Sequence, residues 1–333
     1  MKLESLHIKN YKLFKDLEIP KLGRVNLITG KNNTGKTILL EALRIWASEG
    51  DASVIDNIIW KRGDWEKGAN LKSYSSLFFN HKISRIYGPA NSDLASLKGQ
   101  IIINNIDIIA REDTGRDLVF STRKKKPHFD EMELVNNLVA HIEKPNNPQD
   151  KAIFVPANIE FDNKKLWANI DLTDKKDMVI QILQIIEPSI MDLGIIDNVA
   201  RVRTKDSKTP VPLKNFGEGL NRLLTIAMAL VSAEGNLLLI DEIDTGLHYT
   251  VLEKLWEIIF AYAEKLDVQV FVTTHSNDCV SAFSYVYSRN EKNKELGNYF
   301  RLRRSREDES VIEPVHYGSD ELEDALMSNI ETR

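Results

Sequence analysis

An octapeptide near the start of the chain restricts the fold more than any other segment. Residues 30–37 match the phosphate-loop pattern G-x-x-x-x-G-K-[ST] at every fixed position, after an apolar run at residues 25–29 and before a helical pattern at residues 38–46. In this order of strand, loop and helix, backbone N–H groups of the loop and the helix N-terminus face one anion. The residues expected to surround the phosphates are Gly30, Lys31, Asn32, Asn33, Thr34, Gly35, Lys36 and Thr37. The segment therefore predicts an α/β fold with a nucleotide site.

Two carboxylates end a second apolar run much later in the chain. Residues 237–240 are leucine or isoleucine, and Asp241 and Glu242 follow them. Ligands of open α/β sheets bind at the carboxyl ends of the strands, so we expect both acids to face the phosphate loop. Lys36 would then reach the β- and γ-phosphates, and Thr37 and Asp241 would bind magnesium. Glu242 would polarise a water for in-line attack, which favours hydrolysis of the nucleotide over binding alone.

Two further segments indicate how the site is completed. Gly217, Glu218 and Gly219 open an apolar helix just upstream of the acidic strand and form a second anion cradle. A chain that already has a phosphate loop does not need a second cradle for the same nucleotide. We therefore expect this cradle to serve the γ-phosphate of a nucleotide bound to another copy of the chain. His275 follows a buried strand pattern at residues 270–274, where it can donate a hydrogen bond to a γ-phosphate.

The order of these four motifs resembles the ABC-type ATPase heads of the RecF, SMC and OLD group. The segments Ile240 to His248 and Phe271 to Ser276 resemble in particular the stand-alone AAA-type ATPases that are similar to the OLD proteins, and the likeness covers residues 1–48 and 150–290. It implies a head-to-tail dimer with two sandwiched ATP molecules. Gly217, Glu218 and Gly219 would act in trans, Asp241 and Glu242 in cis, and His275 as the switch histidine.

The same resemblance implies a P-loop NTPase fold with a mixed sheet flanked by helices, a β-rich N-terminal lobe and a small helical subdomain. We expect one ABC-type head over residues 1–333. Its parts are a β-rich insertion (51–150), a helical segment leading to the glycine signature (165–215), a core with signature, acidic strand and histidine (216–290), and C-terminal strands with a helix (291–333).

Three positions depart from the broader ABC pattern. The signature lacks the serine that usually contacts the γ-phosphate, so backbone N–H groups or Asn221 would make that contact. His248 stands where many ABC heads carry an aspartate after the acidic strand. Asn158 or Glu160 occupies the place of the glutamine loop, and the sequence does not choose between them.

Periodicity gives more local expectations. Alternation at residues 2–11 predicts a strand, and residues 100–110 and 117–121 predict strands around a turn at residues 113–115. Helices are expected near residues 130–142, at 173–187, after the acidic strand and after Ser319, and a strand pair is expected at 299–304 and 311–317.

Composition limits the cellular setting. Among 333 residues no apolar run approaches the roughly 20 residues of a spanning helix, and the N-terminus has no apolar signal region. Cys279 is the only cysteine, so an intrachain disulfide is excluded and the cytoplasm is the expected compartment. The net charge of -5 argues against a protein that binds nucleic acid over its whole surface.

One basic cluster keeps a local DNA contact open. Arg123, Lys124, Lys125 and Lys126 are adjacent and could neutralise several phosphates. A solvated hairpin or loop next to an acidic stretch is the simpler explanation, because no stacking aromatics interleave with the cluster.

The hypothesis from these motifs is an ATPase that drives or gates a separately encoded nuclease or toxin in phage defence, because we expect the chain to end too early for a Toprim nuclease domain of its own. The alternatives are a nucleotide-gated scaffold with slow hydrolysis and a RecF-like DNA-binding ATPase in repair.

Overall fold

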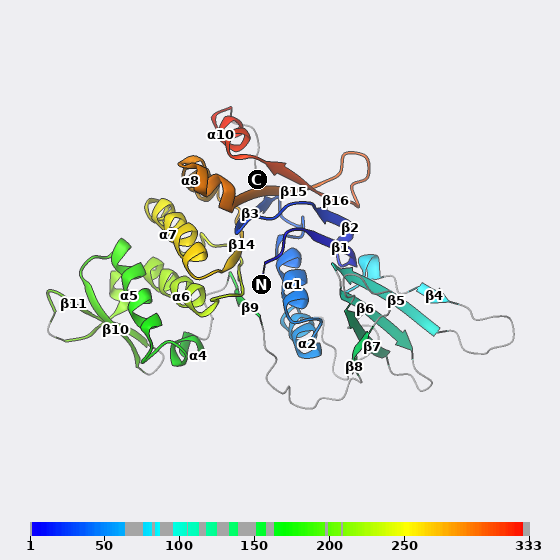
Figure 1. Cartoon of the computed structure of the whole chain (residues 1–333), viewed down its shortest axis with the longest axis horizontal. Helices are drawn as coiled ribbons and strands as arrows, with labels where there is room; N and C mark the ends of the chain where they lie inside the picture. Colours follow the sequence, from blue (N-terminus) through cyan, green and yellow to red (C-terminus); the bar gives the residue numbers. More distant parts are fainter. Residues whose placement is uncertain are drawn as a thin grey trace.

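The computed structural model describes residues 2–63, 76–81, 84–86, 96–104, 106–112, 118–124, 133–138, 151–157, 163–196, 199–207 and 209–328. Within these residues, a central mixed sheet lies between a β-rich lobe and a segment built from helices and a β-hairpin (Figure 1). The expected mixed sheet flanked by helices is confirmed.

The described strands of the central sheet run in the order β16-β15-β3-β14-β13-β9. Their bounds are β3 (Val25–Gly30), β9 (Ala152–Val155), β13 (Leu237–Ile240), β14 (Gln269–Thr273), β15 (Gly297–Arg304) and β16 (Ile312–Tyr317). Among these six described strands of the central sheet, only β15 and β16 pair antiparallel; the other neighbours are parallel. Every residue of β3, β13 and β14 is buried, which explains why they are mainly apolar and why β13 is wholly so: a parallel sheet is covered on both faces.

Alternate residues of β13 enter two different cores. Leu237 and Leu239 pack in a core with α1 (Lys36–Ala47), whereas Leu238 and Ile240 pack in a core with α6 (Glu218–Ser232). The second core also receives the other helices of that face, α7 (Leu252–Lys265), α8 (Asn277–Ser288) and, through Leu322, α10 (Ser319–Met327). The strand thus holds its C-terminal end fixed between the phosphate-loop helix and the signature helix.

The β-rich lobe is one antiparallel sheet with the described order β2-β1-β5-β6-β7-β8, and β4 pairs with β5. Its strands are β1 (Leu6–Tyr11), β2 (Phe14–Ile19), β4 (Ser84–Ile86), β5 (Ser96–Ile103), β6 (Ile106–Glu112), β7 (Leu118–Lys124) and β8 (Glu133–Leu138). Pairing of β1 with β5 joins the N-terminal hairpin to the later strands. The expected insertion therefore extends the N-terminal lobe, and it begins with a helix, α2 (Ala52–Lys61).

Two local predictions in this lobe were wrong. The helix expected near residues 130–142 is absent from the described part, where β8 pairs with β7. The run at residues 100–110 is a hairpin rather than one strand, because Asn104 adopts a left-handed φ of 51° between β5 and β6. The turn expected at residues 113–115 lies outside the described residues.

The segment before the signature is only half helical. It contains α4 (Asn163–Ala168), α5 (Asp174–Ile186), β10 (Ile190–Ile196), β11 (Val199–Thr204), β12 (Val211–Pro212) and a 3-10 turn at Leu213–Phe216. Helix α5 confirms the prediction for residues 173–187. It begins after the Thr173 cap and buries Val179, Ile182 and Leu183. The C-terminal strand pair and the helix after Ser319 are also confirmed, with a short helix α9 (Glu291–Leu296) before them.

Candidate functional site

The phosphate loop joins the end of β3 to the start of α1 and needs its glycines. Gly30 has a φ of 141°, and a Cβ added there would lie 2.4 Å from the Leu302 carbonyl oxygen of β15. Gly35 has a φ of 95° and faces the ring of Phe14 in the same way. Thr34 closes the loop from inside, since its hydroxyl donates to the Lys31 carbonyl at 2.8 Å. Of the other expected loop residues, Lys31, Asn32 and Asn33 are exposed.

Lys36 lies in the centre of this loop. Its Nζ donates to the carbonyls of Gly30 at 2.7 Å and Lys31 at 3.1 Å, and the residue is only 6% exposed. Burial lowers the pKa of the Lys36 ammonium to about 8, and the charges of Glu242 and Asp241 partly oppose that shift. The side chain is thus placed to exchange two carbonyl partners for the oxygens of a phosphate.

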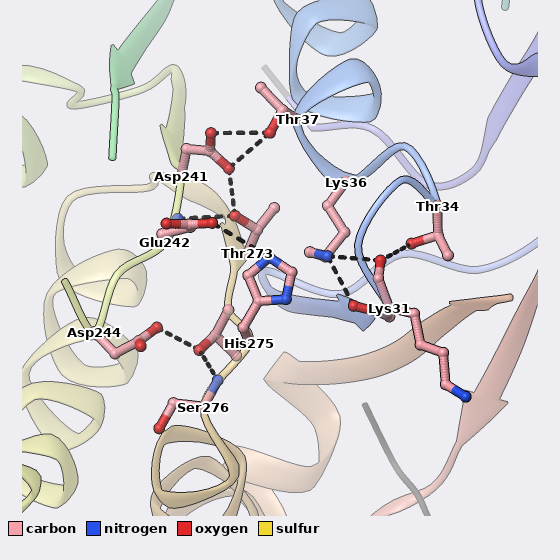
Figure 2. A network of polar contacts seen from close by, with 12 residues as sticks. Lys31, Thr34, Lys36, Thr37, Asp241, Glu242, Asp244, Thr273, His275 and Ser276 are labelled. Atoms are coloured by element: carbon pink, nitrogen blue, oxygen red, sulfur yellow. Dashed lines mark hydrogen bonds and ion pairs between the residues drawn. The ribbon is translucent and has the colours of Figure 1, made fainter. Parts of the chain in front are cut away.

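Thr37 and Asp241 meet although 204 positions separate them. The Thr37 hydroxyl donates to the Asp241 Oδ2 at 3.0 Å and lies 3.3 Å from Oδ1. Asp241 is 8% exposed, and its Oδ1 also accepts a 2.6 Å hydrogen bond from the Thr273 hydroxyl at the end of β14. Figure 2 shows these three side chains where the ends of β13 and β14 approach α1.

The donor set fits magnesium. A Mg²⁺ ion takes one or two protein oxygens and completes an octahedron with phosphate oxygens and waters. The Thr37 hydroxyl and the buried Asp241 carboxylate are two such oxygens side by side. No cluster of three or more His, Cys, Asp or Glu side chains that could hold a metal ion occurs among the described residues.

Glu242 and His275 form the remaining part of the site. Glu242 has a left-handed φ of 47°, and its N–H donates to the Thr273 hydroxyl at 2.9 Å. Its Oε1 lies 3.2 Å from the His275 Nε2. The Glu242 side chain is 40% exposed and the His275 side chain 38%. In Figure 2 the pair stands across from Lys36, so acid, histidine and ammonium converge from three segments of the chain.

The cavity at this site measures about 850 Å³, within the range of small-molecule sites. Its walls come from the phosphate loop, from His275, from Arg304 of β15 and from the β-rich lobe. The lobe and α2 contribute Lys12, Leu13, Arg62, Ser76, Phe78 and Asn80. The lobe is therefore a wall of the cavity. The sequence predicted a β-rich extension of the lobe that binds ATP, but not which of its residues line the cavity. Glu41 of α1 pairs with two of these residues, at 2.7 Å from the Nε of Arg62 and 3.4 Å from the Nζ of Lys12.

The signature lies elsewhere. Gly217 and Glu218 are exposed at the start of α6, and a Cβ on Gly219 would lie 3.2 Å from the Gly246 carbonyl oxygen. Gly217 and Gly219 line a separate hollow of about 260 Å³ that also includes Leu247 and His248. None of residues 217–219 is among the described residues that line the cavity at the phosphate loop. Within one chain, the structure does not bring the signature to the phosphate loop.

Sequence reasoning missed several partners of the acidic residues. Thr273 contacts both Asp241 and Glu242, and the neighbouring Thr274 hydroxyl donates to the Asp244 carboxylate. Two threonines that end an otherwise apolar strand before a histidine are a signal that could have indicated such contacts. Arg222 donates to backbone carbonyls beside the site, and an arginine in the apolar helix after the signature was a second such signal.

The other candidate residues are placed as follows. Asn158 and Glu160 lie outside the described residues, so neither glutamine-loop alternative is placed. Arg123 and Lys124 end strand β7 beside β8, whereas Lys125 and Lys126 lie outside the described residues.

Two more residues have structural contacts. His248 caps a 3-10 turn through Thr250. Cys279 is buried, which raises the pKa of its thiol to about 12. No helix in the described part of the chain is long and apolar enough to span a membrane.

A family model identifies the family of the chain, and solved structures show its fold. Residues 25–280 match the family described as "AAA domain, putative AbiEii toxin, Type IV TA system". An ATP/GTP phosphatase of Helicobacter pylori is 23% identical, over 96% of this chain and 97% of its own. Two solved Smc heads have 13% identity and cover 98% of this chain. One, bound to the C-terminal winged-helix domain of ScpA, matches over 100% of its own chain with a TM-score of 0.52. The other, with an extended coiled coil and bound to the C-terminal domain of ScpA derived from Pyrococcus furiosus, matches over 99% with a TM-score of 0.51.

Proposed function

The chain belongs to the AAA-domain family described as a putative AbiEii toxin of a Type IV TA system, and from this premise we propose how its site works. It is an ATPase with an AAA/ABC-type head of the SMC/RecF-like group.

The reaction proposed is ATP and water to ADP and phosphate. The observation that carries it is the meeting of Lys36 and Thr37 with Asp241 and Glu242 from opposite ends of the sequence: Asp241 contacts Thr37, and the charges of both acids act on Lys36. The Lys36 ammonium binds β- and γ-phosphate oxygens, and Thr37 and Asp241 would hold a magnesium ion, which supplies charge neutralisation when bound. Glu242 accepts a proton from the attacking water, and His275 donates from Nε2 to the γ-phosphate.

A single-turnover assay tests these roles. We expect Glu242→Gln to slow hydrolysis about 10²- to 10⁴-fold, because the amide cannot accept the proton. Glu264→Gln is the matched control: this glutamate of α7 pairs with Lys292 on the surface, and its variant should hydrolyse ATP at the unmodified rate. Hydrolysis by Glu242→Gln as fast as the control would show that the assigned base is wrong.

We further propose that two heads bind head to tail around two ATP molecules. The exposed position of Gly217 and Glu218, and the absence of residues 217–219 from the described lining of their own chain's cavity, support a role in trans. The Glu242→Gln variant should become dimeric when ATP and magnesium are added, as measured by sedimentation velocity. A monomer at saturating ATP would contradict the arrangement.

The biological role proposed is to drive or gate a separately encoded toxin or nuclease in phage defence. The family description supports an association with a toxin–antitoxin system, and the nuclease and phage defence rest on the resemblance to OLD-like ATPases. The neighbouring gene is expressed in cells alone, with this chain and with its Lys36→Met variant. We expect the growth effect of the neighbour to change only when the chain can bind ATP. Identical growth with both forms of the chain would contradict gating by nucleotide.

A further inference from the structure

Arg222 occupies an unusual position for a charged residue. It lies near the start of α6, between the buried Leu220 and Leu223, and it is itself only 5% exposed. Burying a guanidinium costs free energy, and an apolar residue of similar volume often stabilises a fold at least as well. Its presence among apolar neighbours therefore needs an explanation in what it contacts.

The guanidinium joins the ends of two neighbouring strands. Nη1 donates to the Pro156 carbonyl after β9 at 2.8 Å. Nη2 donates to the Asp241 carbonyl at 3.1 Å and to the Glu242 carbonyl at 3.3 Å, both directly after β13. The last ladder bond between these strands, from the Asp241 N–H to the Val155 carbonyl, is 2.9 Å long. Arg222 thus holds the chain where the sheet pairing stops and the acidic turn begins.

Glu242 is held by hydrogen bonds on both sides of its Cα. Its N–H is bound by Thr273 and its carbonyl by Arg222, although its φ of 47° is unfavourable for a glutamate. These two contacts fix the direction in which the Glu242 side chain leaves the backbone. That direction brings its carboxylate to 3.2 Å from His275.

The charges around Arg222 are consistent with a buried, charged guanidinium that binds the backbone. Burial lowers the pKa of its guanidinium, and the charges of Asp241, Asp244 and Glu242 act in the opposite direction. The arginine is thus a buried cation among the carboxylates of the acidic turn, while its hydrogen bonds are made to the backbone. It leaves those carboxylates available for Thr37, Thr273 and His275.

We propose that Arg222 is a positioning residue that fixes Glu242 for catalysis and ties its position to the signature helix. Arg222 stands within one helical turn of Gly219, so a shift of the signature end of α6 moves the guanidinium and with it the Glu242 peptide. Hydrolysis then depends on where the signature sits, without Arg222 touching the nucleotide. The inference rests on the proposed role of Glu242 as the base.

The test compares Arg222→Met and Arg222→Lys with a matched control, Arg24→Met. Arg24 stands at the opposite end of the same sheet, where its Nη1 donates to the Asp267 carboxylate at 2.8 Å and to the carbonyls of Ala263 at 3.4 Å and Val268 at 3.5 Å. Each variant is measured for thermal unfolding, affinity for a fluorescent ATP analogue with magnesium, and single-turnover hydrolysis at saturating ATP.

We expect Arg222→Met to lower the hydrolysis rate about 10²-fold, because a shift of about 1 Å in a catalytic group has an effect of that size. Its affinity for the nucleotide should change less than about threefold, since phosphate and magnesium ligands are untouched. Arg222→Lys should recover only part of the rate, because its ammonium keeps the charge and can donate to one strand end but lacks the two separate nitrogens that reach both. Arg24→Met should lose thermal stability but keep its hydrolysis rate.

Two results would overturn the inference: hydrolysis by a folded Arg222→Met protein at the unmodified rate, or equal losses of rate in Arg222→Met and Arg24→Met. If Arg222→Met does not fold, an unmodified rate in Arg222→Lys overturns it instead. Glu242→Gln, assayed in parallel, distinguishes a failure of the proposed base from a failure of the positioning role. A fast Glu242→Gln protein refutes the assigned base, whereas a slow Glu242→Gln with a fast Arg222→Met refutes only the positioning role.

Discussion

The phosphate loop and the signature both place glycine before a helix, but their glycines have different surroundings. A Cβ at Gly30 would lie 2.4 Å from a backbone oxygen of β15, whereas a Cβ at Gly217 would meet no atom of the described residues within 4 Å. Both glycines have a positive φ, 141° and 101°. The first is required by packing inside the chain and the second by backbone conformation alone. The phosphate loop therefore packs against its own chain, whereas no described residue of the same chain packs against Gly217 of the signature.

The largest effect is expected from Gly30→Ala. The new methyl group would meet the Leu302 carbonyl, and the φ of 141° is strained for alanine, so we expect a loss of more than about 3 kcal/mol of folding free energy and of nucleotide binding. Urea unfolding and ATP-analogue titration measure both quantities. If the Gly30→Ala protein were as stable as the unmodified protein, packing against Leu302 would not be the reason for glycine at this position.

Gly217→Ala should affect function more than stability. With a φ of 101° and a ψ of 156°, alanine costs about 1–3 kcal/mol, but it has room for its methyl group. We expect nucleotide affinity of the single chain to be kept and hydrolysis to fall about 10²-fold, as on loss of a preorganised hydrogen-bond donor. Loss of affinity equal to that of Gly30→Ala would show that the two segments act in the same chain.

The Lys36 ammonium provides a pH test of the loop. Its pKa is lowered to about 8 in the free protein, and bound phosphate charge should raise it again. Binding should therefore take up about half a proton per nucleotide at pH 8 and almost none at pH 6, and affinity should fall as the pH rises through 8. Calorimetry in buffers of different ionisation enthalpy measures this uptake. Lys36→Arg should abolish it, because arginine stays protonated. Equal uptake by both proteins would contradict the assignment.

The smallest effect concerns a third anion-binding candidate, the basic cluster at residues 123–126. If it contacts DNA, replacing Arg123 and Lys124 by glutamine should reduce the slope of log affinity against log salt by about 2 and leave ATP hydrolysis unchanged. Fluorescence anisotropy with duplex DNA measures the slope. An unchanged slope would exclude these two residues as phosphate contacts.

The sequence predicted the central sheet better than the lobe, for a physical reason. Strands such as β13 are buried on both faces, so their apolar runs do not depend on a particular neighbour. Residues 133–138 instead form a strand by pairing with β7, and residues 100–110 turn back at Asn104; both depend on partners that a local pattern does not contain. The hairpin after α5 was missed for the same reason.

The site shows a similar division. The phosphate loop, the acidic pair and His275 were predicted because each motif carries its chemistry in adjacent residues. Thr273, Arg222 and the lobe residues of the cavity act through contacts across the chain, such as the bond between Thr273 and Asp241. Sequence spacing could mark these residues as unusual, but it could not say which residue each one contacts.

The left-handed φ of Glu242 has an evolutionary consequence. Glycine or asparagine would relieve about 1 kcal/mol of backbone strain at this position, so selection for thermal stability alone would not retain a glutamate there. With Glu242 as the proposed base, selection for hydrolysis opposes that drift. Descendants that keep the phosphate loop but carry Asp-Gly or Asp-Asn after β13 should therefore be more heat-resistant pseudoenzymes, recognisable from their sequences before any assay.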